Sequence, residues 1–370
     1  MLETARSQGD ILQLCHGYSA PFLDCARQYA RLFRGTPRKV VTVYLTGAPD
    51  ERVTRESASD AVVFLDYTSA AIRGLKLAAI RDVRRIVAGR DFSLCIAHRF
   101  KSVHVALLAT DLPVIGVHHA FGDYQRLSRR LFANIFRARL RLLGVSDAVR
   151  DDLRAALPAW TAGRITTLYN RIDRAGTEAA LFSRTAARAA LGLPPDTWIV
   201  GNVGRLHPDK DQSTLIRAFA LALPQLPPGS LLAIMGSGRL EKTLKTLAAE
   251  LGIRDVVRFL GQVAEGRRYF RAFDAFALSS DREPFGMVLL EALAAGLPVI
   301  CGDCGGSREV VEGVGALFPP GDAGALARCL VHAAEPPPPD YPARAAECLD
   351  QRFSDAAAAA RFWRFMEESA

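Results

Sequence analysis

The sequence contains no apolar run that approaches the ~18–20 residues of a membrane-spanning helix. Its start, MLETARSQGD, also lacks the basic-then-apolar pattern of a secretory signal peptide. The seven cysteines are odd in number and scattered, and several lie in apolar strand-like runs (Cys15, Cys95, Cys301). We therefore expect a soluble, cytoplasmic protein in which these cysteines are reduced, small, buried residues.

Lysine is scarce, with six residues, so arginine supplies almost all of the positive charge. The formal net charge of +8 favours anionic partners such as phosphorylated ligands or a membrane surface. The basic residues are not regularly interleaved with aromatics, and no nucleic-acid-binding motif is present. A nucleic-acid partner is therefore not expected.

The chain of 370 residues is long enough for two domains. Short apolar strands alternate with helical patterns over residues 1–170, and a second alternation occupies residues 196–350. This pattern predicts two α/β domains with parallel, doubly wound sheets, whose ligands bind beyond the carboxyl ends of the strands. Residues 171–195 lack strand character and end in Leu193-Pro194-Pro195, which predicts a linker. A last helix is expected over residues 354–370.

The segment 279–309 contains the most informative pattern in the chain. Glu283 and Glu291 bracket the start of a predicted helix with seven residues between them, and Gly305-Gly306 is predicted to form a loop after the next strand. Two carboxylates at this spacing can hold separate parts of one extended, polyhydroxylated ligand. The free N–H groups of the helix start and of the glycine loop can bind an anion between them.

A second glycine-containing loop, which is basic, follows the predicted strand 198–203. It contains Arg205 and Lys210, whose guanidinium and ammonium groups suit a diphosphate, although ordinary solvated charges are the alternative. The same loop has an Asp-x-Asp pattern, but the lysine at its centre would compete with a metal ion. We interpret Asp209 and Asp211 as helix-start residues.

Two other motifs carry less information. Gly236-Ser237-Gly238 lacks the third glycine of a dinucleotide-binding fingerprint, so a tight strand-to-helix turn explains it better. Cys301 and Cys304 form a single Cys-x-x-Cys pair, which cannot by itself close a zinc site.

Three groups of residues together resemble the donor-site motifs of the family-four retaining nucleotide-sugar glycosyltransferases: Gly204-Arg205-Leu206 with Lys210, Glu283-Pro284-Phe285-Gly286 with Glu291, and Gly305-Gly306 with Glu309. The resemblance is close over about 198–332 and looser over 11–170. It implies a GT-B fold, in which two Rossmann-like domains face each other across a cleft and the C-terminal helix crosses back to the N-terminal acceptor domain. It also implies transfer of a sugar from a nucleotide-diphosphate sugar to a saccharide or glycolipid acceptor.

The resemblance assigns roles to individual residues. Arg205 and Lys210 would neutralise the donor diphosphate, so that no metal or other cofactor is expected. Glu291 would bind the ribose, and Glu283 would act at the transferred sugar. His119 matches the histidine near that sugar, with a register open by one residue because His118 precedes it. The other donor-binding positions are Gly17, Gln262, Val263, Phe285, Gly286, Met287, Gly305 and Gly306.

Two other functions fit the same fold. A GT-B sugar-nucleotide epimerase would bind the same donor without an acceptor. A non-catalytic GT-B scaffold would bind glycan or membrane, but it would not need to keep Glu283, Glu291, Arg205 and Lys210 together. No candidate nucleophile stands in the expected place, which favours front-face displacement assisted by the leaving phosphate.

The segment 126–141 is basic and amphipathic, with Leu127, Leu131 and Ile135 on one side. The pattern fits a helix lying on the anionic cytoplasmic face of the inner membrane. The alternative is a helix that packs this apolar side against the core. Residues 14–18 and 169–171 resemble those of lipopolysaccharide-core glycosyltransferases, so a lipopolysaccharide acceptor is one expectation.

Overall fold

The structure, a computed structural model, describes residues 9–19 and 21–368. The chain divides into two compact units. Unit 1 comprises the described residues through Asn170 together with those from Ala358 onward, and unit 2 comprises Arg171–Ala357. The first eight residues, on which the expectation of no signal peptide depends, lie outside the described part. No helix in the described ranges is long and apolar enough to cross a membrane.

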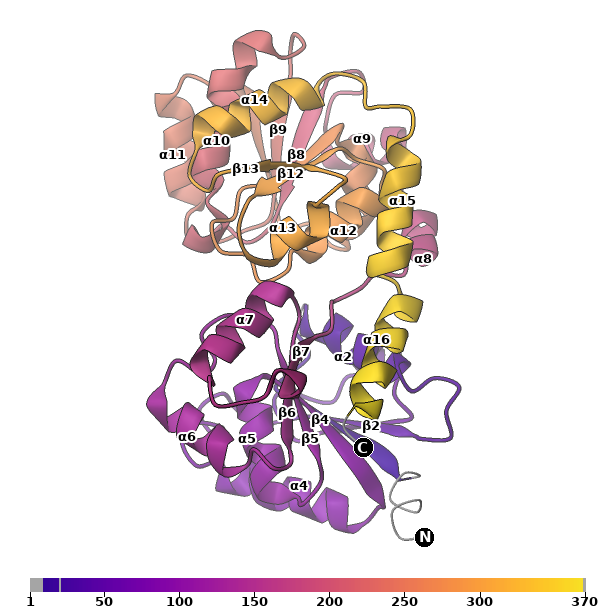
Figure 1. The fold of residues 1–370 in the computed structure, drawn as a ribbon. Helices are drawn as coiled ribbons and strands as arrows, with labels where there is room; N and C mark the ends of the chain where they lie inside the picture. The colour runs from indigo at the N-terminus through magenta and orange to yellow at the C-terminus, as the bar shows by residue number, and fades with distance from the viewer. Residues whose placement is uncertain (1–8, 20, 369–370) are drawn as a thin grey trace. The chain divides into compact units, whose positions relative to one another are not determined.

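Unit 1 is built on a seven-stranded parallel sheet with the order β3-β2-β1-β4-β5-β6-β7. Figure 1 labels the strands β2, β4, β5, β6 and β7 of this sheet. The order changes direction beside β1, as in doubly wound nucleotide-binding folds. From Ile11 onward β1 is buried at every position, because helices cover both faces of a parallel sheet. The strands are β1 (Asp10–Cys15), β2 (Val40–Tyr44), β3 (Ala61–Phe64), β4 (Phe92–His98), β5 (Val114–His118), β6 (Leu140–Gly144) and β7 (Ile165–Thr167).

Most helices of unit 1 follow its strands in the chain. The last one comes from the C-terminal end of the sequence. In the last helix, Phe362 and Trp363 each pack edge-on against Phe33 with ring centroids 5.6 Å apart. The chain therefore returns to unit 1 at its C-terminal helix. The helices are α2 (Phe22–Arg31), α3 (Glu51–Glu56), α4 (Leu77–Ala88), α5 (Arg99–Ala109), α6 (Leu127–Ile135), α7 (Asp147–Ala156) and α16 (Asp355–Glu367).

Unit 2 contains a six-stranded parallel sheet with the order β10-β9-β8-β11-β12-β13. Its core packs apolar side chains of β8 and β9 against α10 and α14. The strands are β8 (Ile199–Val203), β9 (Leu231–Met235), β10 (Val257–Gly261), β11 (Ala275–Leu278), β12 (Val299–Gly302) and β13 (Ala316–Phe318). The helices are α8 (Arg174–Ala180), α9 (Arg184–Leu191), α10 (Gln212–Ala222), α11 (Glu241–Glu250), α12 (Met287–Ala294), α13 (Gly305–Val311), α14 (Ala323–Ala333) and α15 (Tyr341–Arg352).

The predicted α/β class with two parallel, Rossmann-like sheets is confirmed. Some elements differ from prediction. Gly305 and Gly306 are not in a loop but begin α13, whose Val310 and Val311 are buried. The helix α4 begins at Leu77, directly after Lys76, whose backbone is left-handed with φ of 58°.

The range 171–195, predicted as a linker, contains α8 and α9 and belongs to unit 2. The side chain of Arg188 is almost completely buried and pairs with Asp274 at 2.7 Å. Its guanidinium also donates to the carbonyl oxygens of Ala272 and Pro195, at 2.9 and 2.6 Å. The bonds to Ala272 and Asp274 attach α9 to residues more than 80 positions later in the chain.

Candidate active site

The donor-site motifs of unit 2 all follow the carboxyl ends of its strands. Gly204 follows β8, Gln262 follows β10, Glu283 lies in the turn after β11, and Gly305 comes after β12. Since the strands are parallel, these segments lie along one edge of the sheet, where ligands of open α/β sheets bind. The structure thus brings the predicted donor-binding positions of unit 2 to the same edge.

Lys210 and Glu283 form an ion pair at this edge. Lys210 Nζ lies 2.6 Å from Glu283 Oε2, and the two side chains are only 17% and 9% exposed. Ser280 Oγ donates to the same carboxylate oxygen at 3.0 Å, and Ser279 Oγ donates to the carbonyl oxygen of Lys210 at 2.9 Å. These two serines directly follow β11 and belong to none of the predicted donor-binding positions. Together these bonds hold a largely buried ammonium and carboxylate in one arrangement.

The turn around Glu283 packs backbone-to-backbone against the start of α13. The N–H of Gly306 donates to the carbonyl oxygen of Glu283 at 2.9 Å. A Cβ at position 306 would overlap the carbonyl oxygen of Pro284 and lie 2.8 Å from the Cα of Phe285. Only glycine allows this approach. The glycine pair therefore fixes the turn that carries Glu283.

The helix α12 begins at this turn without a side-chain cap. Gly286 precedes it with φ of 91°, which favours glycine. Phe285 is buried and packs against Phe353, with ring centroids 5.8 Å apart. Met287 is the first residue of the helix, and Glu291 lies half-buried one turn further along. Uncapped first-turn N–H groups are suited to an anion.

The basic loop after β8 has one exposed and one buried cation. The side chain of Arg205 is 72% exposed and lies 3.5 Å from Asp209, whereas Lys210 is largely buried. The carboxylate of Asp211 accepts the N–H of Thr214 at 3.3 Å and caps α10, so its predicted role as a helix-start residue is confirmed. Within residues 9–19 and 21–368, no group of three or more His, Cys, Asp or Glu side chains could hold a metal ion.

The Gly236-Ser237-Gly238 turn packs against the basic loop. Gly236 has φ of 140°, and a Cβ there would overlap the carbonyl oxygen of Gly204. Its N–H donates to the carbonyl oxygen of Gly261 at 2.7 Å, immediately before Gln262 and Val263. The turn thereby connects the loops after β8 and β10. Close approach of backbones explains these glycines, as the interpretation of a tight turn predicted.

In unit 1, Gly17 and His119 follow the carboxyl ends of β1 and β5. His98, at the end of the neighbouring strand β4, stacks on His119 with Nδ1 3.1 Å from His119 Nε2. His118 is completely buried, and its Nδ1 lies 2.6 Å from Asp123 Oδ2. His119 is the one of the tandem pair that is partly exposed. No motif in the sequence predicts its pairing with His98.

The buried His98 and the partly buried His119 make unit 1 sensitive to acid. Burial, with the nearby His118, lowers the pKa of His98 from 6.5 to about 3, and burial also lowers the pKa of His119 well below its usual value. Below pH ~6.5 the unfolded chain therefore binds more protons at these positions than the folded protein, and stability falls as pH falls toward 3. We expect the melting temperature to drop between pH 7 and 4.5, and to drop less in His98→Asn. His332→Asn is the control, because that histidine side chain is 81% exposed, and its melting temperature should change with pH as in the parent. An equal change of melting temperature with pH in all three proteins would contradict this assignment.

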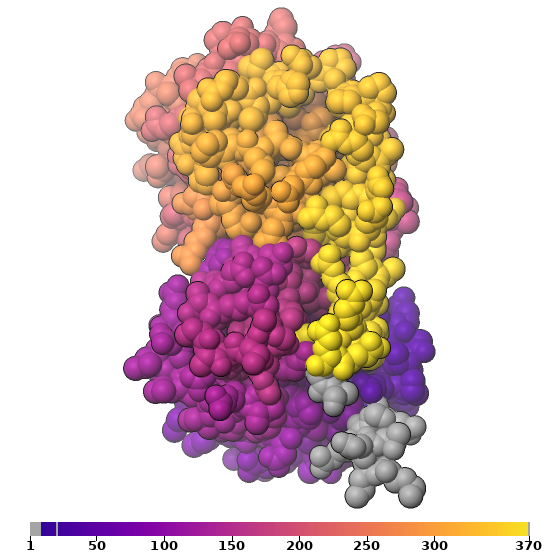
Figure 2. All heavy atoms as spheres, in the orientation of Figure 1, coloured from indigo at the N-terminus to yellow at the C-terminus, as the bar shows by residue number. Residues whose placement is uncertain are grey.

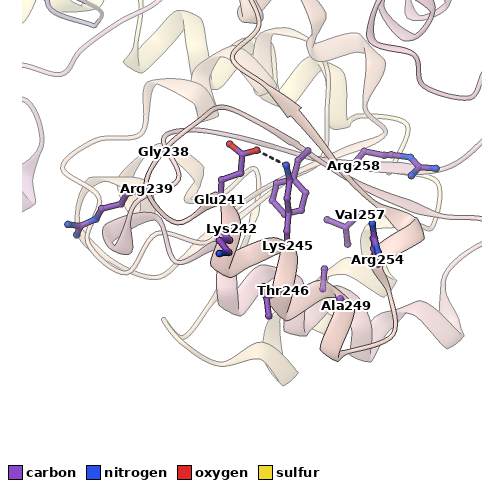
Figure 3. Close-up of a pocket in the computed structure, with 12 residues that line it drawn as sticks. Gly238, Arg239, Glu241, Lys242, Lys245, Thr246, Ala249, Arg254, Val257 and Arg258 are labelled. Carbon is purple, nitrogen blue, oxygen red and sulfur yellow. Dashed lines mark hydrogen bonds and ion pairs between the residues drawn. The ribbon is translucent and has the colours of Figure 1, made fainter.

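A separate hollow of about 940 Å³ lies between α11 and the edge strand β10 (Figure 3). Glu241 and Lys245 of α11 form an ion pair at 2.6 Å beside it. Its described lining contains none of the predicted donor-binding residues but carries five basic ones: Arg239, Lys242, Lys245, Arg254 and Arg258. Charged side chains along an edge strand hinder its pairing with a second chain. We interpret the basic residues of this basic hollow as charges that protect the edge strand β10 from pairing with a second chain.

Two family models match the chain in succession. The model described as Glycosyltransferase Family 4 matches residues 23–175, and the model described as Glycosyl transferases group 1 matches residues 183–341. The two matches fall almost entirely within unit 1 and unit 2 respectively. Together they cover most of the chain.

Curated relatives carry the names of glycosyltransferases, and solved structures share the fold. A D-inositol 3-phosphate glycosyltransferase of Streptomyces scabiei is 33% identical over 278 residues, which are 68% of this chain and 62% of that protein. The chain spans about half to three fifths of the length of such relatives. The structure of Anabaena Alr3699/HepE with UDP and glucose superposes with a TM-score of 0.77 at 21% identity, covering 97% of this chain and 99% of that one. The lipopolysaccharide outer core galactosyltransferase WaaB superposes with a TM-score of 0.71 at 16% identity, covering 98% and 100%.

Proposed function

The chain belongs to the family-four glycosyltransferases, and we propose that it transfers a sugar from a nucleotide-diphosphate sugar to a saccharide acceptor. The observation that carries this proposal is the largely buried Lys210–Glu283 pair beside the start of α12. It combines a cation for a diphosphate with a carboxylate for sugar hydroxyls at the ligand-binding edge of unit 2. Lysine and glutamate side chains that serve only as surface charges are normally exposed to solvent. The burial of both side chains therefore indicates a role in the site.

The chemistry follows from the charges that develop in the reaction. As the bond between the anomeric carbon and the phosphate oxygen breaks, the diphosphate gains negative charge and the sugar becomes oxocarbenium-like. The ammonium of Lys210, the guanidinium of Arg205 and the first-turn N–H groups of α12 stabilise the leaving diphosphate. Because these groups supply the positive charge, we propose a reaction that needs no metal ion.

The remaining residues position the donor and the acceptor. Glu283 binds hydroxyls of the transferred sugar, and Glu291 binds the ribose; the role that the resemblance implies for His119 stays a prediction. In the retaining reaction that we propose, the acceptor oxygen bonds to the anomeric carbon on the face that the phosphate leaves. The departing phosphate oxygen takes the proton of the acceptor hydroxyl, so no protein nucleophile is required.

The relatives indicate the classes of donor and acceptor. HepE was solved with UDP and glucose, which supports a UDP-sugar as donor. The names of WaaB and of the inositol phosphate enzymes support a saccharide or polyol acceptor, with the lipopolysaccharide core as one member of the class. We propose that the protein acts in the cytoplasm at the inner face of the membrane, on a free or lipid-linked glycan.

A nucleotide screen followed by product analysis tests the proposal. We expect UDP to raise the melting temperature more than the other nucleoside diphosphates do. A ligand at 100 times its Kd stabilises the native state by about 2.7 kcal/mol, which is enough to measure. With an α-linked UDP-sugar, nucleotide should be released only when a saccharide acceptor is present, and NMR should show an α-linked product. A β-linkage would refute retention. Sugar epimerisation without an acceptor would identify an epimerase, and binding without turnover would identify a scaffold.

A further inference from the structure

The helix α6 presents an apolar line to solvent. Leu127, Leu131 and Ile135, spaced four residues apart, are 63%, 54% and 75% exposed. The other side of α6 packs inward: the ring of Phe132 stacks on His104 at 4.7 Å, and Ala133 is completely buried. The alternative that this apolar side packs against the core is therefore wrong. Figure 2 shows the magenta segment that includes α6 at the surface of unit 1.

A second exposed apolar pair lies at the start of α4. Leu75 and Leu77 are 70% and 69% exposed. Within the described part of the chain six large hydrophobic residues are exposed, and five of them belong to these two segments; the sixth is Leu221 of unit 2. Isolated exposed leucines need no explanation, but such a concentration marks an interaction surface.

The two segments flank the same helix. Arg84 of α4 donates to the carbonyl oxygen of Leu108 of α5 at 2.9 Å, and Phe100 of α5 packs edge-on against Phe132 of α6. Burial and the charges of Lys101 and Arg129 together lower the pKa of Lys76, which places the turn before α4 near α5 and α6. All three helices follow parallel strands, so their first turns lie at the carboxyl edge of the sheet.

The charge around these residues is mainly positive, although Asp82 pairs with Arg81 and Asp123 pairs with Arg129 where the two segments end or begin. Residues 67–81 and 124–141 contain no aspartate or glutamate. Exposed arginines accompany the apolar side chains in both segments, among them Arg73, Arg126 and Arg130. Two copies of such a surface would repel each other, because cations would face cations. Apolar side chains surrounded by arginines match instead the boundary between anionic headgroups and acyl chains.

We propose that Leu75, Leu77, Leu127, Leu131 and Ile135, with the arginines around them, form a docking surface for an anionic lipid bilayer. The apolar side chains enter the headgroup boundary, and the arginines contact lipid phosphates. The surface places the carboxyl edge of the unit 1 sheet, which carries His98 and His119, next to the membrane. Docking requires neither donor nor turnover, so it can fail or succeed independently of the proposed function.

Vesicle sedimentation of the full chain tests the proposal without any sugar donor. We expect binding to vesicles of phosphatidylcholine with about one third phosphatidylglycerol, and at least about tenfold weaker binding to pure phosphatidylcholine. Leu131→Glu and Arg130→Glu should each lower the partition coefficient by about tenfold or more. Two matched controls should bind like the parent: Leu221→Glu, at an exposed leucine of unit 2, and Lys242→Glu, in the basic hollow.

Three results would overturn the proposal. Leu131→Glu could bind as well as Leu221→Glu, or Lys242→Glu could lose binding while Arg130→Glu keeps it. Light scattering could also show a dimer that Leu131→Glu dissociates, which would make the surface an interface between copies. All four positions are exposed, so their variants should melt within a few degrees of the parent; a variant that does not is replaced by the serine or glutamine substitution at the same position.

Discussion

Replacing Lys210 with alanine is expected to lower kcat/KM by about 10²–10³-fold, the usual consequence of removing one preorganised donor to developing negative charge. The Lys210 side chain is 17% exposed and its ammonium is held 2.6 Å from Glu283, so water cannot take its place with the same geometry. The variant also leaves Glu283 nearly buried without its counter-charge. Steady-state kinetics with a UDP-sugar and a saccharide acceptor measure the loss.

Two controls separate this effect from general loss of charge or of structure. Lys242→Ala removes an exposed cation of unit 2 that lies in the basic hollow, and its kcat/KM should stay within about twofold of the parent. Lys210→Ala combined with Glu283→Ala restores neutrality, so its melting temperature should exceed that of Lys210→Ala while its activity stays low. Near-parental turnover in Lys210→Ala, with the protein folded at the assay temperature, would refute the role of Lys210.

The strands and the edge that carries the donor motifs could be predicted because both depend on local pattern. β-branched and aliphatic runs such as 40–44 and 231–235 favour strands, and their alternation with helices dictates a parallel sheet. Once the sheet is parallel, residues that follow its strands share one edge. Glu283 and Lys210, 73 residues apart, could therefore be predicted in one site from their positions after strands.

The features that could not be predicted depend on tertiary contacts. The α9 helix is held by Arg188 bonding to Asp274, 86 residues away, so residues 171–195 alone resemble a linker. The pairing of His98 with His119 requires β4 beside β5, which a single sequence does not specify. The side of α6 that packs inward is set by Phe132 against His104, although Leu127, Leu131 and Ile135 form an equally regular apolar line. Periodicity locates an apolar face but does not say what covers it.

Replacing Gly236 with alanine is expected to reduce both the stability of unit 2 and the activity. At φ of 140° an L-residue is strained, and the new Cβ would overlap the carbonyl oxygen of Gly204. The neighbour is backbone and cannot rotate away, so the loops after β8 and β9 must separate. We expect the free energy of unfolding to fall by about 3 kcal/mol or more, beyond the typical point mutation.

The same substitution at Gly229 isolates the cause. Gly229 also has positive φ, at 77°, but a Cβ there would meet no atom within 4 Å, so Gly229→Ala should cost only the backbone strain of about 1–2 kcal/mol. Urea unfolding of both variants measures the difference, which reports the close approach of the two loops. Because the displaced loop carries Arg205 and Lys210, Gly236→Ala should also lose activity that Gly229→Ala keeps. Equal stability and equal activity in the two variants would show that the turn after β9 does not hold the basic loop in place.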